Sequence, residues 1–366
     1  MKSFDLSIAL FSLIAIVLGL FYERLKRSVL NETFLSMLFG ILLGPAVFNM
    51  IDVGEWGRTE DIMEKACRLT LSMSLMATAF RINPRYILAN KKNQAVLLLL
   101  VMPAMLLSSA ALIHYLLGVH WRLSFLTGAI ITPTDPVLSG AIVTGDLSKK
   151  ILPAKIRDTI SFESGANDGL AFPFVMLCMG LFSKSEHTWR DWLLNTILVE
   201  TVGAILLGII IGYILGKALE YCIRRNFTGK PAILPFSLSI GFSVLTGLEI
   251  LGVNSILAVF VTGLILKRTL SKKEDIEDKE VQEMMSRLFT LPIFVIFGLI
   301  LPWVSWFKLG WIAVCLVITI LLFRRLPFLF LFKPLLKGFK NPDLLFIGWF
   351  GPVGVAALFY TFYTYR

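Results

Sequence analysis

Cysteine and histidine are scarce in this sequence, which argues against a metal or redox centre. The 366 residues include only four cysteines and three histidines. The cysteines lie far apart and form no Cys-x-x-Cys pair, so they are interpreted as apolar filler. They occupy positions 67, 178, 222 and 315. No Walker motif occurs, which disfavours an ATP-driven function, and no cofactor is expected.

Charged residues are also few, at 16% of the chain against about 25% in a typical soluble domain. Hydrophobic residues make up 56%, and the mean hydropathy is +0.77. Apolar runs such as 6–22 and 201–216 approach the ~20 residues that span a hydrocarbon core. A lipid-embedded chain must be helical or a closed barrel, and these runs lack the alternation of barrel strands. The sequence therefore predicts an all-α polytopic membrane protein, with the lipid bilayer as its surroundings.

About twelve transmembrane helices are predicted, and the distribution of basic residues supports them. The predicted spans are 5–22, 33–51, 66–81, 94–118, 123–145, 155–182, 193–219, 232–249, 252–267, 286–304, 308–325 and 344–364. Of the 35 Lys and Arg residues, 26 fall at the loops of one side, so the N-terminus is predicted outside a plasma membrane.

Every basic residue is assigned to a loop or a helix end, and none is expected deep in a span. The net charge of +10 then reflects the excess of basic residues in the loops on one side of the membrane. No nucleic-acid partner is therefore expected. The segment 271–283 carries mixed charges and is expected to be a solvated loop or surface helix.

Three acids are predicted to lie deep in spans, where burying a charged side chain has a high free-energy cost. They are Asp135, Glu163 and Asp168. Asp135 follows Thr134 and stands between Pro133 and Pro136. Prolines within a helix remove hydrogen bonds and break it. Broken helices that expose carbonyls to a cavity are typical of secondary transporters. The alternative is a proline kink that holds a hydrogen-bonded aspartate.

The second acidic cluster lies at 161–173. Glu163 and Asn167 are spaced i,i+4, and Ser164 and Asp168 form the adjacent stripe of the same helix. Oxygen atoms of this kind suit a dehydrated alkali cation. Gly165 and Gly169 are expected to let another backbone approach closely. The alternative is a polar network that only holds helices together.

A carboxylate buried without a basic partner favours binding of a proton or a cation. If one site holds either H⁺ or a monovalent cation, competition between them couples the two fluxes. The two acidic clusters therefore predict a cation/proton antiporter and no enzyme.

Thr134-Asp135-Pro136, followed by Glu163-Ser164-x-x-Asn167-Asp168, resembles the NhaP-type branch of the monovalent cation:proton antiporters, in the sodium/hydrogen exchanger family. Three further segments fit this family, at 251–266, 291–302 and 349–358. The resemblance implies a homodimer of thirteen-helix protomers, built from inverted repeats with two crossing discontinuous helices. It implies exchange of Na⁺ or Li⁺ for H⁺, and K⁺ is an alternative cation.

The resemblance also implies roles for single residues. Asp168 is expected to be loaded alternately with proton and cation, and Thr134, Glu163 and Ser164 to help bind Na⁺. Asp135 is expected to balance the dipoles of the broken helices. An asparagine at position 167 beside Asp168 implies electroneutral exchange.

Two features depart from the family pattern. Val353 stands where relatives often carry an arginine that pairs with Glu163, so Glu163 is expected to be uncompensated, protonated or paired elsewhere. Residues 1–366 are predicted to form a single exchanger domain that ends before the thirteenth helix, and impaired transport is expected. The alternatives are a K⁺/H⁺ antiporter with the same machinery and a non-transporting membrane protein, either a degenerate scaffold or an intramembrane enzyme.

Overall fold

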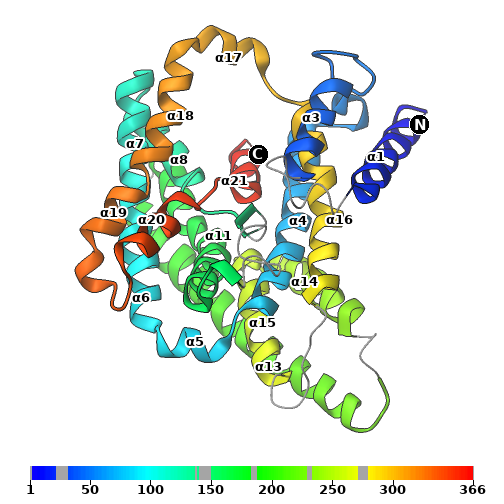
Figure 1. The fold of residues 1–366 in the computed structure, drawn as a ribbon, viewed down its shortest axis with the longest axis vertical. Coiled ribbons are helices and arrows are strands. Elements are labelled where there is room, and N and C mark those ends of the chain that lie inside the picture. The colour runs from blue at the N-terminus through cyan, green and yellow to red at the C-terminus, as the bar shows by residue number, and fades with distance from the viewer. Residues whose placement is uncertain are drawn as a thin grey trace.

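All regular elements are helical in the part of the chain that the structure describes, as the apolar runs predict. The structure is a computed structural model, and Figure 1 shows its helices packed into one bundle. The residues it describes are 2–21, 32–136, 138–139, 150–182, 188–228, 233–270 and 279–365.

The first half of the bundle contains long helices joined by short turns. Their bounds are α1 (Lys2–Leu20), α3 (Glu32–Leu43), η1 (Val53–Trp56), α4 (Thr59–Arg81), α5 (Pro84–Ala89), α6 (Lys91–Val96), η2 (Leu97–Val101), α7 (Met102–Leu117) and α8 (Trp121–Ile130). Helices α6 and α7 run into each other through the π-helical segment η2. Local signals set the shorter elements: α5 begins with a proline, and the Asn83 side chain caps it by accepting from Arg85 N.

The second half begins with the longest element that is α-helical throughout, among the described residues. The bounds are α11 (Ala154–Phe182), α12 (Thr188–Asp191), η3 (Trp192–Val202), α13 (Gly203–Arg224), α14 (Ile233–Ile250), α15 (Ser255–Leu270), α16 (Lys279–Leu299), α17 (Trp303–Leu309), α18 (Trp311–Phe323), α19 (Leu326–Leu331), η5 (Lys333–Leu335), α20 (Asn341–Trp349) and α21 (Val355–Thr364).

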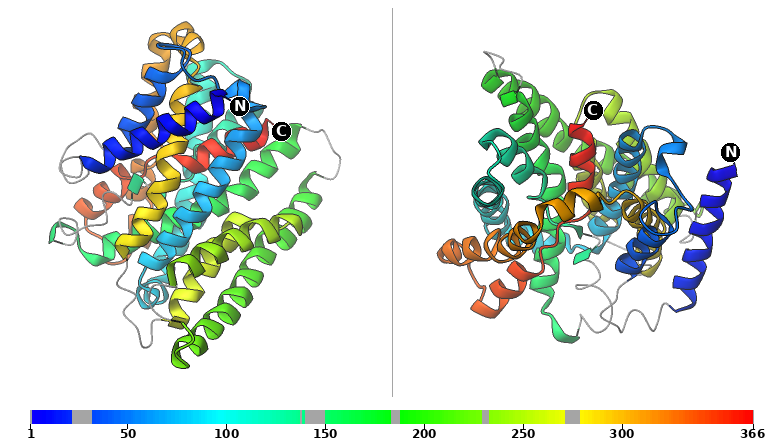
Figure 2. Two further views of the ribbon diagram at one scale, coloured as in Figure 1. Left: turned by 90° about the vertical axis from the view of Figure 1, so that its right-hand side faces the viewer. Right: turned by 90° about the horizontal axis from the view of Figure 1, so that it is seen from above.

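Helices α4 and α11 lie at the centre, and α1, α13 and α18 lie towards the edges (Figures 1 and 2). The apolar part of α11 is 50% buried, against 17% for Trp311–Leu331. Peripheral helices therefore leave apolar faces for lipid, whereas α11 faces protein and can carry polar groups. Its Gly169 lies against α15 so closely that a Cβ atom there would be 2.7 Å from Leu257 Cα. The close approach expected from this glycine is confirmed.

Within the described residues, four helices are long and apolar enough to cross a membrane, or five if one bent pair is a single span. They are Lys91–Leu117, Ala154–Phe182, Thr188–Arg224 and Trp311–Leu331, and the bent pair joins Leu288–Leu299 to Trp303–Leu309. Each of the twelve predicted spans coincides with helical segments, but the number of crossings stays a prediction.

Several predicted spans differ from the structure; the one at 33–51, for example, is helical only to Leu43. Helix α8 ends at Ile130 because the chain leaves the helix before Pro133. The end of the predicted span, at 140–145, lies outside the described residues, as does the part 271–278 of the predicted charged segment. The span predicted to end at 325 instead continues through α19 to Leu331. The prediction that no basic residue lies deep in a span is therefore wrong, since Arg324 and Arg325 fall inside this one.

Candidate functional site

Two interrupted helices meet at the centre of the bundle. After α8 the chain is non-helical until Pro136, and between α20 and α21 it is non-helical at 350–354. The two interruptions touch: Asp135 N donates to Pro352 O at 2.8 Å, and Val355 N donates to Asp135 Oδ2 at 2.7 Å. The expected pair of discontinuous, crossing segments is confirmed.

The Asp135 carboxylate accepts hydrogen bonds from backbone N–H groups just after each of the two interruptions. Its Oδ1 accepts from Leu138 N at 3.1 Å, and its Oδ2 accepts from Val355 N. Helix N-termini carry partial positive charge, so a carboxylate there is stabilised. A Cβ atom at Gly354 would lie 1.7 Å from Oδ2, so only glycine permits this approach.

Arg324 occupies the opposite ends of the same interruptions. Its Nη1 donates to Ile131 O, just past the end of α8, and its Nη2 donates to Gly351 O, just past the end of α20. Helix C-termini carry partial negative charge, which a guanidinium neutralises. The crossing thus has an acid at its helix starts and a base at its helix ends.

Glu163 forms an ion pair with Arg325, with 2.5 Å between Oε2 and Nη2, and both side chains are 2% exposed. Of the three states expected for Glu163, the one found is pairing elsewhere. Val353 is 38% exposed and takes no part in the pair. The base comes instead from the turn between α18 and α19. Its signal in the sequence is an apolar run on both sides of the two arginines.

Thr134, Ser164 and Asn167 form one buried hydrogen-bond network between the broken segment and α11. Thr134 Oγ1 donates to Ser164 Oγ at 3.1 Å and accepts from Asn167 Nδ2 at 2.8 Å. Thr134 N donates to Asn167 Oδ1 at 3.1 Å. Ser139 Oγ, which the sequence did not single out, lies 3.4 Å from Ser164 Oγ. Predicted site residues from two helices are therefore in direct contact.

Asp168 lies beside this network and differs from the other two acids. Its side chain is fully buried, and neither carboxylate oxygen has a hydrogen-bond partner among the described residues. Its backbone carbonyl accepts from the Tyr360 hydroxyl at 2.5 Å, a contact that the sequence did not suggest. A charged group buried without a partner is strongly disfavoured, and a carboxylate can be neutralised by a proton or a cation.

A family model described as a transmembrane sodium/hydrogen exchanger matches residues 9–363. Over 362 residues the chain is 31% identical to Na(+)/H(+) antiporter 2 of Zygosaccharomyces rouxii, which covers 96% of this chain. The chain spans 44% of the length of that relative. A K(+)/H(+) antiporter NhaP2 of a Shewanella species is 25% identical over 246 residues, covering 67% of this chain and 41% of the relative.

The fold is also found among solved structures. The sodium proton antiporter MjNhaP1 of Methanocaldococcus jannaschii matches with a TM-score of 0.78 at 20% identity. The match covers 99% of this chain and 86% of that one. At this identity the similarity shows the fold.

Proposed function

The chain belongs to the sodium/hydrogen exchanger family, and from this premise we propose that it exchanges Na⁺ or Li⁺ for H⁺ across a membrane. The observation that carries the proposal is Asp168, a fully buried carboxylate without a hydrogen-bond partner among the described residues. A proton and a monovalent cation are the two ligands that neutralise such a group, and each excludes the other.

In this mechanism, Asp168 binds a proton on one face and exchanges it for a cation on the other. Thr134 and Ser164 supply hydroxyl oxygens beside it, and hard cations prefer oxygen ligands. Asn167 orients Thr134 through two hydrogen bonds, one to its backbone N–H and one to its hydroxyl. A hydroxyl can turn a lone pair towards a cation and its proton away from it.

The exchange is proposed to be electroneutral, with one proton for each cation. Of the three deep acids, Glu163 is neutralised by Arg325, and Asp135 is held by backbone N–H groups of two helix starts. Asp168 is then the one acid of the three that remains to exchange a bound proton for the transported cation. We assign Glu163, expected among the cation ligands, to positioning α11 through its ion pair.

Residues 1–366 are proposed to act as a single exchanger domain in a plasma membrane, with the N-terminus outside and a second copy as dimer partner. The excess of Lys and Arg on one side supports the orientation. The apolar, exposed faces of peripheral helices such as α18 are consistent with lipid surroundings.

The test is dissipation of a pH gradient in everted vesicles on addition of Na⁺, Li⁺ or K⁺. Asp168→Asn should abolish the response, since an amide neither exchanges a proton nor carries charge. Asp61→Asn is the matched control, because Asp61 lies in an exposed ion pair with Arg58 and should leave the response unchanged. A full response in Asp168→Asn, or none to any cation from folded wild-type protein, would refute the proposal.

K⁺/H⁺ exchange is the second candidate, and the similarity to a K(+)/H(+) antiporter favours it. The same vesicles distinguish the two. A response to K⁺ at concentrations where Na⁺ and Li⁺ give none would replace the first proposal, with Asp168 in the same role.

A further inference from the structure

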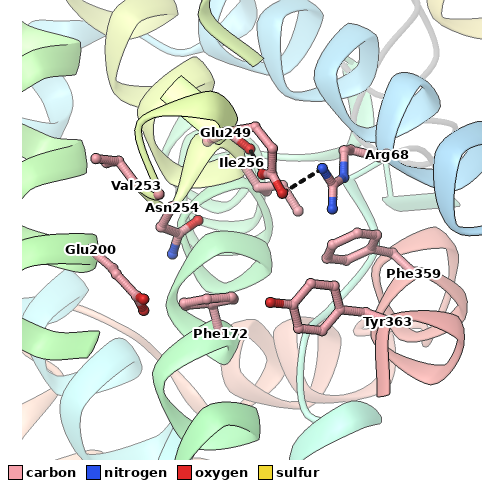
Figure 3. Close-up of a pocket in the computed structure, with 11 residues that line it drawn as sticks. Arg68, Phe172, Glu200, Glu249, Val253, Asn254, Ile256, Phe359 and Tyr363 are labelled. Atoms are coloured by element: carbon pink, nitrogen blue, oxygen red, sulfur yellow. Dashed lines mark hydrogen bonds and ion pairs between the residues drawn. The ribbon is translucent and has the colours of Figure 1, made fainter. Parts of the chain in front are cut away.

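A second charged region lies away from the crossing, where α4, α11, α14, α15, α21 and η3 meet around a cavity of about 90 Å³ (Figure 3). The cavity has room for about six water molecules at ~15 Å³ each. Its polar and aromatic lining includes Arg68, Phe172, Glu200, Glu249, Asn254 and Tyr363. The Glu249 side chain is 39% exposed, so the cavity reaches the surface of the protein there.

Acidic groups outnumber basic ones around this cavity. Arg68 is the one basic residue in the lining, and it is already engaged by Glu64 at 2.6 Å and by Glu249 at 2.7 Å. Glu200 also lines the cavity, and its Oε2 is buried with no hydrogen-bond partner among the described residues. The lining thus holds two carboxylates and one guanidinium, and Glu64 adds a third carboxylate next to Arg68, so the formal charge balance favours entry of a cation.

The floor of the cavity lies against the segment of α11 that follows Asp168. Phe172 lines the cavity and follows Asp168 by four residues in α11, which places it about 6 Å further along the axis and on the same helix face. Asn254 also lines the cavity, and its Nδ2 donates to the carbonyl of Gly169 at 2.9 Å. The cavity thus borders the part of α11 next to the unpartnered carboxylate.

Aromatic rings close this floor. The ring centroids of Phe172 and Tyr363 are 6.1 Å apart, and those of Tyr363 and Phe359 are 5.6 Å apart. Tyr360 follows Phe359 in α21 and holds the Asp168 backbone through its hydroxyl. Aromatic side chains of α11 and α21 therefore border both the cavity and the part of α11 that contains Asp168.

We propose that this cavity is the vestibule through which a monovalent cation approaches Asp168 from one face of the membrane. The proposal rests on the proposed function and adds the route. Glu200 and Glu249 raise the local concentration of cations, and the Phe172–Tyr363 layer must open for the ion to pass. In the described structure the rings of Phe172, Tyr363 and Phe359 are in contact, and this contact is the closed state of the proposed layer.

The first test compares the KM for Na⁺ on each face, in right-side-out and inside-out vesicles. Glu200→Gln and Glu249→Gln should each raise the KM about threefold at low salt, from loss of one charge some 7 Å away in a water-like medium. The effect should appear on one face only, leave kcat unchanged, and shrink as salt screens the charge. Arg68 keeps Glu64 as a partner in Glu249→Gln, so that variant should still fold.

Glu220→Gln is the matched control. Glu220 lies in the same continuous helix as Glu200 but twenty residues further on, about 30 Å away along the axis. It pairs with Lys217 and Arg224 and is remote from the cavity. An equal KM change in Glu220→Gln, or an equal change on both faces, would overturn the vestibule.

A second test is independent of transport. Val253→Cys places a thiol in the cavity lining, and Cys222→Ser with Cys315→Ser removes the native thiols that are not buried. A cationic methanethiosulfonate should react there several times faster than an anionic one, and the preference should vanish when Glu200 and Glu249 are both glutamines. Equal rates for the two reagents would refute the vestibule. Because this labelling does not depend on transport, it tests whether the cavity attracts cations even if the proposed exchange activity fails.

Discussion

Replacing Arg325 with methionine is expected to destabilise the protein strongly. The side chains of Arg325 and Glu163 are both 2% exposed and lie 2.5 Å apart, so water cannot solvate either charge if its partner is removed. Removal of one partner from a buried ion pair costs about 3–5 kcal/mol, because the remaining charge has no counter-charge. Glu163→Gln should cost a similar amount by leaving the guanidinium buried with a neutral partner.

The double variant Glu163→Gln/Arg325→Met should recover most of this loss, since a buried pair can often be replaced by neutral groups at little cost. The four proteins form a double-mutant cycle. If each single variant costs about 4 kcal/mol and the double variant about 1 kcal/mol, the coupling energy is about 7 kcal/mol. The free energy of unfolding can be measured by SDS titration in mixed micelles, followed by helical ellipticity. Arg58→Met is the control, since its exposed pair with Asp61 should contribute at most about 1 kcal/mol.

Additive single effects, with a coupling below about 0.5 kcal/mol, would refute the assignment of this pair as an isolated buried contact. The same double variant also tests the role of Glu163. If it is stable and still exchanges Na⁺ for H⁺, Glu163 positions α11 and does not bind the cation. If it is stable but inactive, Glu163 belongs among the ligands.

Two further variants test the crossing and the hydroxyl network. Gly354→Ala should abolish transport and lower the yield of folded protein, because its Cβ would lie 1.7 Å from Asp135 Oδ2. Gly247→Ala is the control: its Cβ would have nothing within 4 Å, so it should be neutral or stabilise the helix by about 0.5–1 kcal/mol. Equal behaviour of the two variants in a transport assay and a thermal-stability assay would contradict this prediction. Thr134→Ser should keep the KM for Na⁺ within about twofold of the wild-type value. Thr134→Ala should raise the KM about tenfold, because it removes a hydrogen-bonding hydroxyl worth ~1 kcal/mol or more. Equal KM values in the two variants would exclude a role for the hydroxyl.

Local spacing predicted the parts of the site that lie within one helix or beside a break. Glu163, Ser164, Asn167 and Asp168 share one side of α11, as their i,i+3 and i,i+4 spacing requires. The break at Asp135 follows from two prolines, which cannot continue the backbone ladder. The contact between this break and 350–354 could not be derived from spacing, because it joins segments more than 200 residues apart, and only the family resemblance suggested it.

The buried arginines were missed because charge was used as a marker of loops. That rule holds for most of the chain, but Arg324 and Arg325 stand between two apolar stretches, 311–323 and 326–331. A continuous span across them puts both in the protein interior, where acids and carbonyls compensate them. The cavity at Glu200 and Glu249 was missed for a different reason, since its residues come from six separate elements with no motif in common.

The guanidinium of Arg324 holds carbonyl oxygens from both interrupted helices at once. Pulling the two interruptions apart would leave at least one of these two carbonyls without its donor in the buried interior. Such a state is far above thermal energy. In the proposed exchange, the crossing is therefore expected to move as a single rigid body, with the hinges at its borders with the surrounding helices.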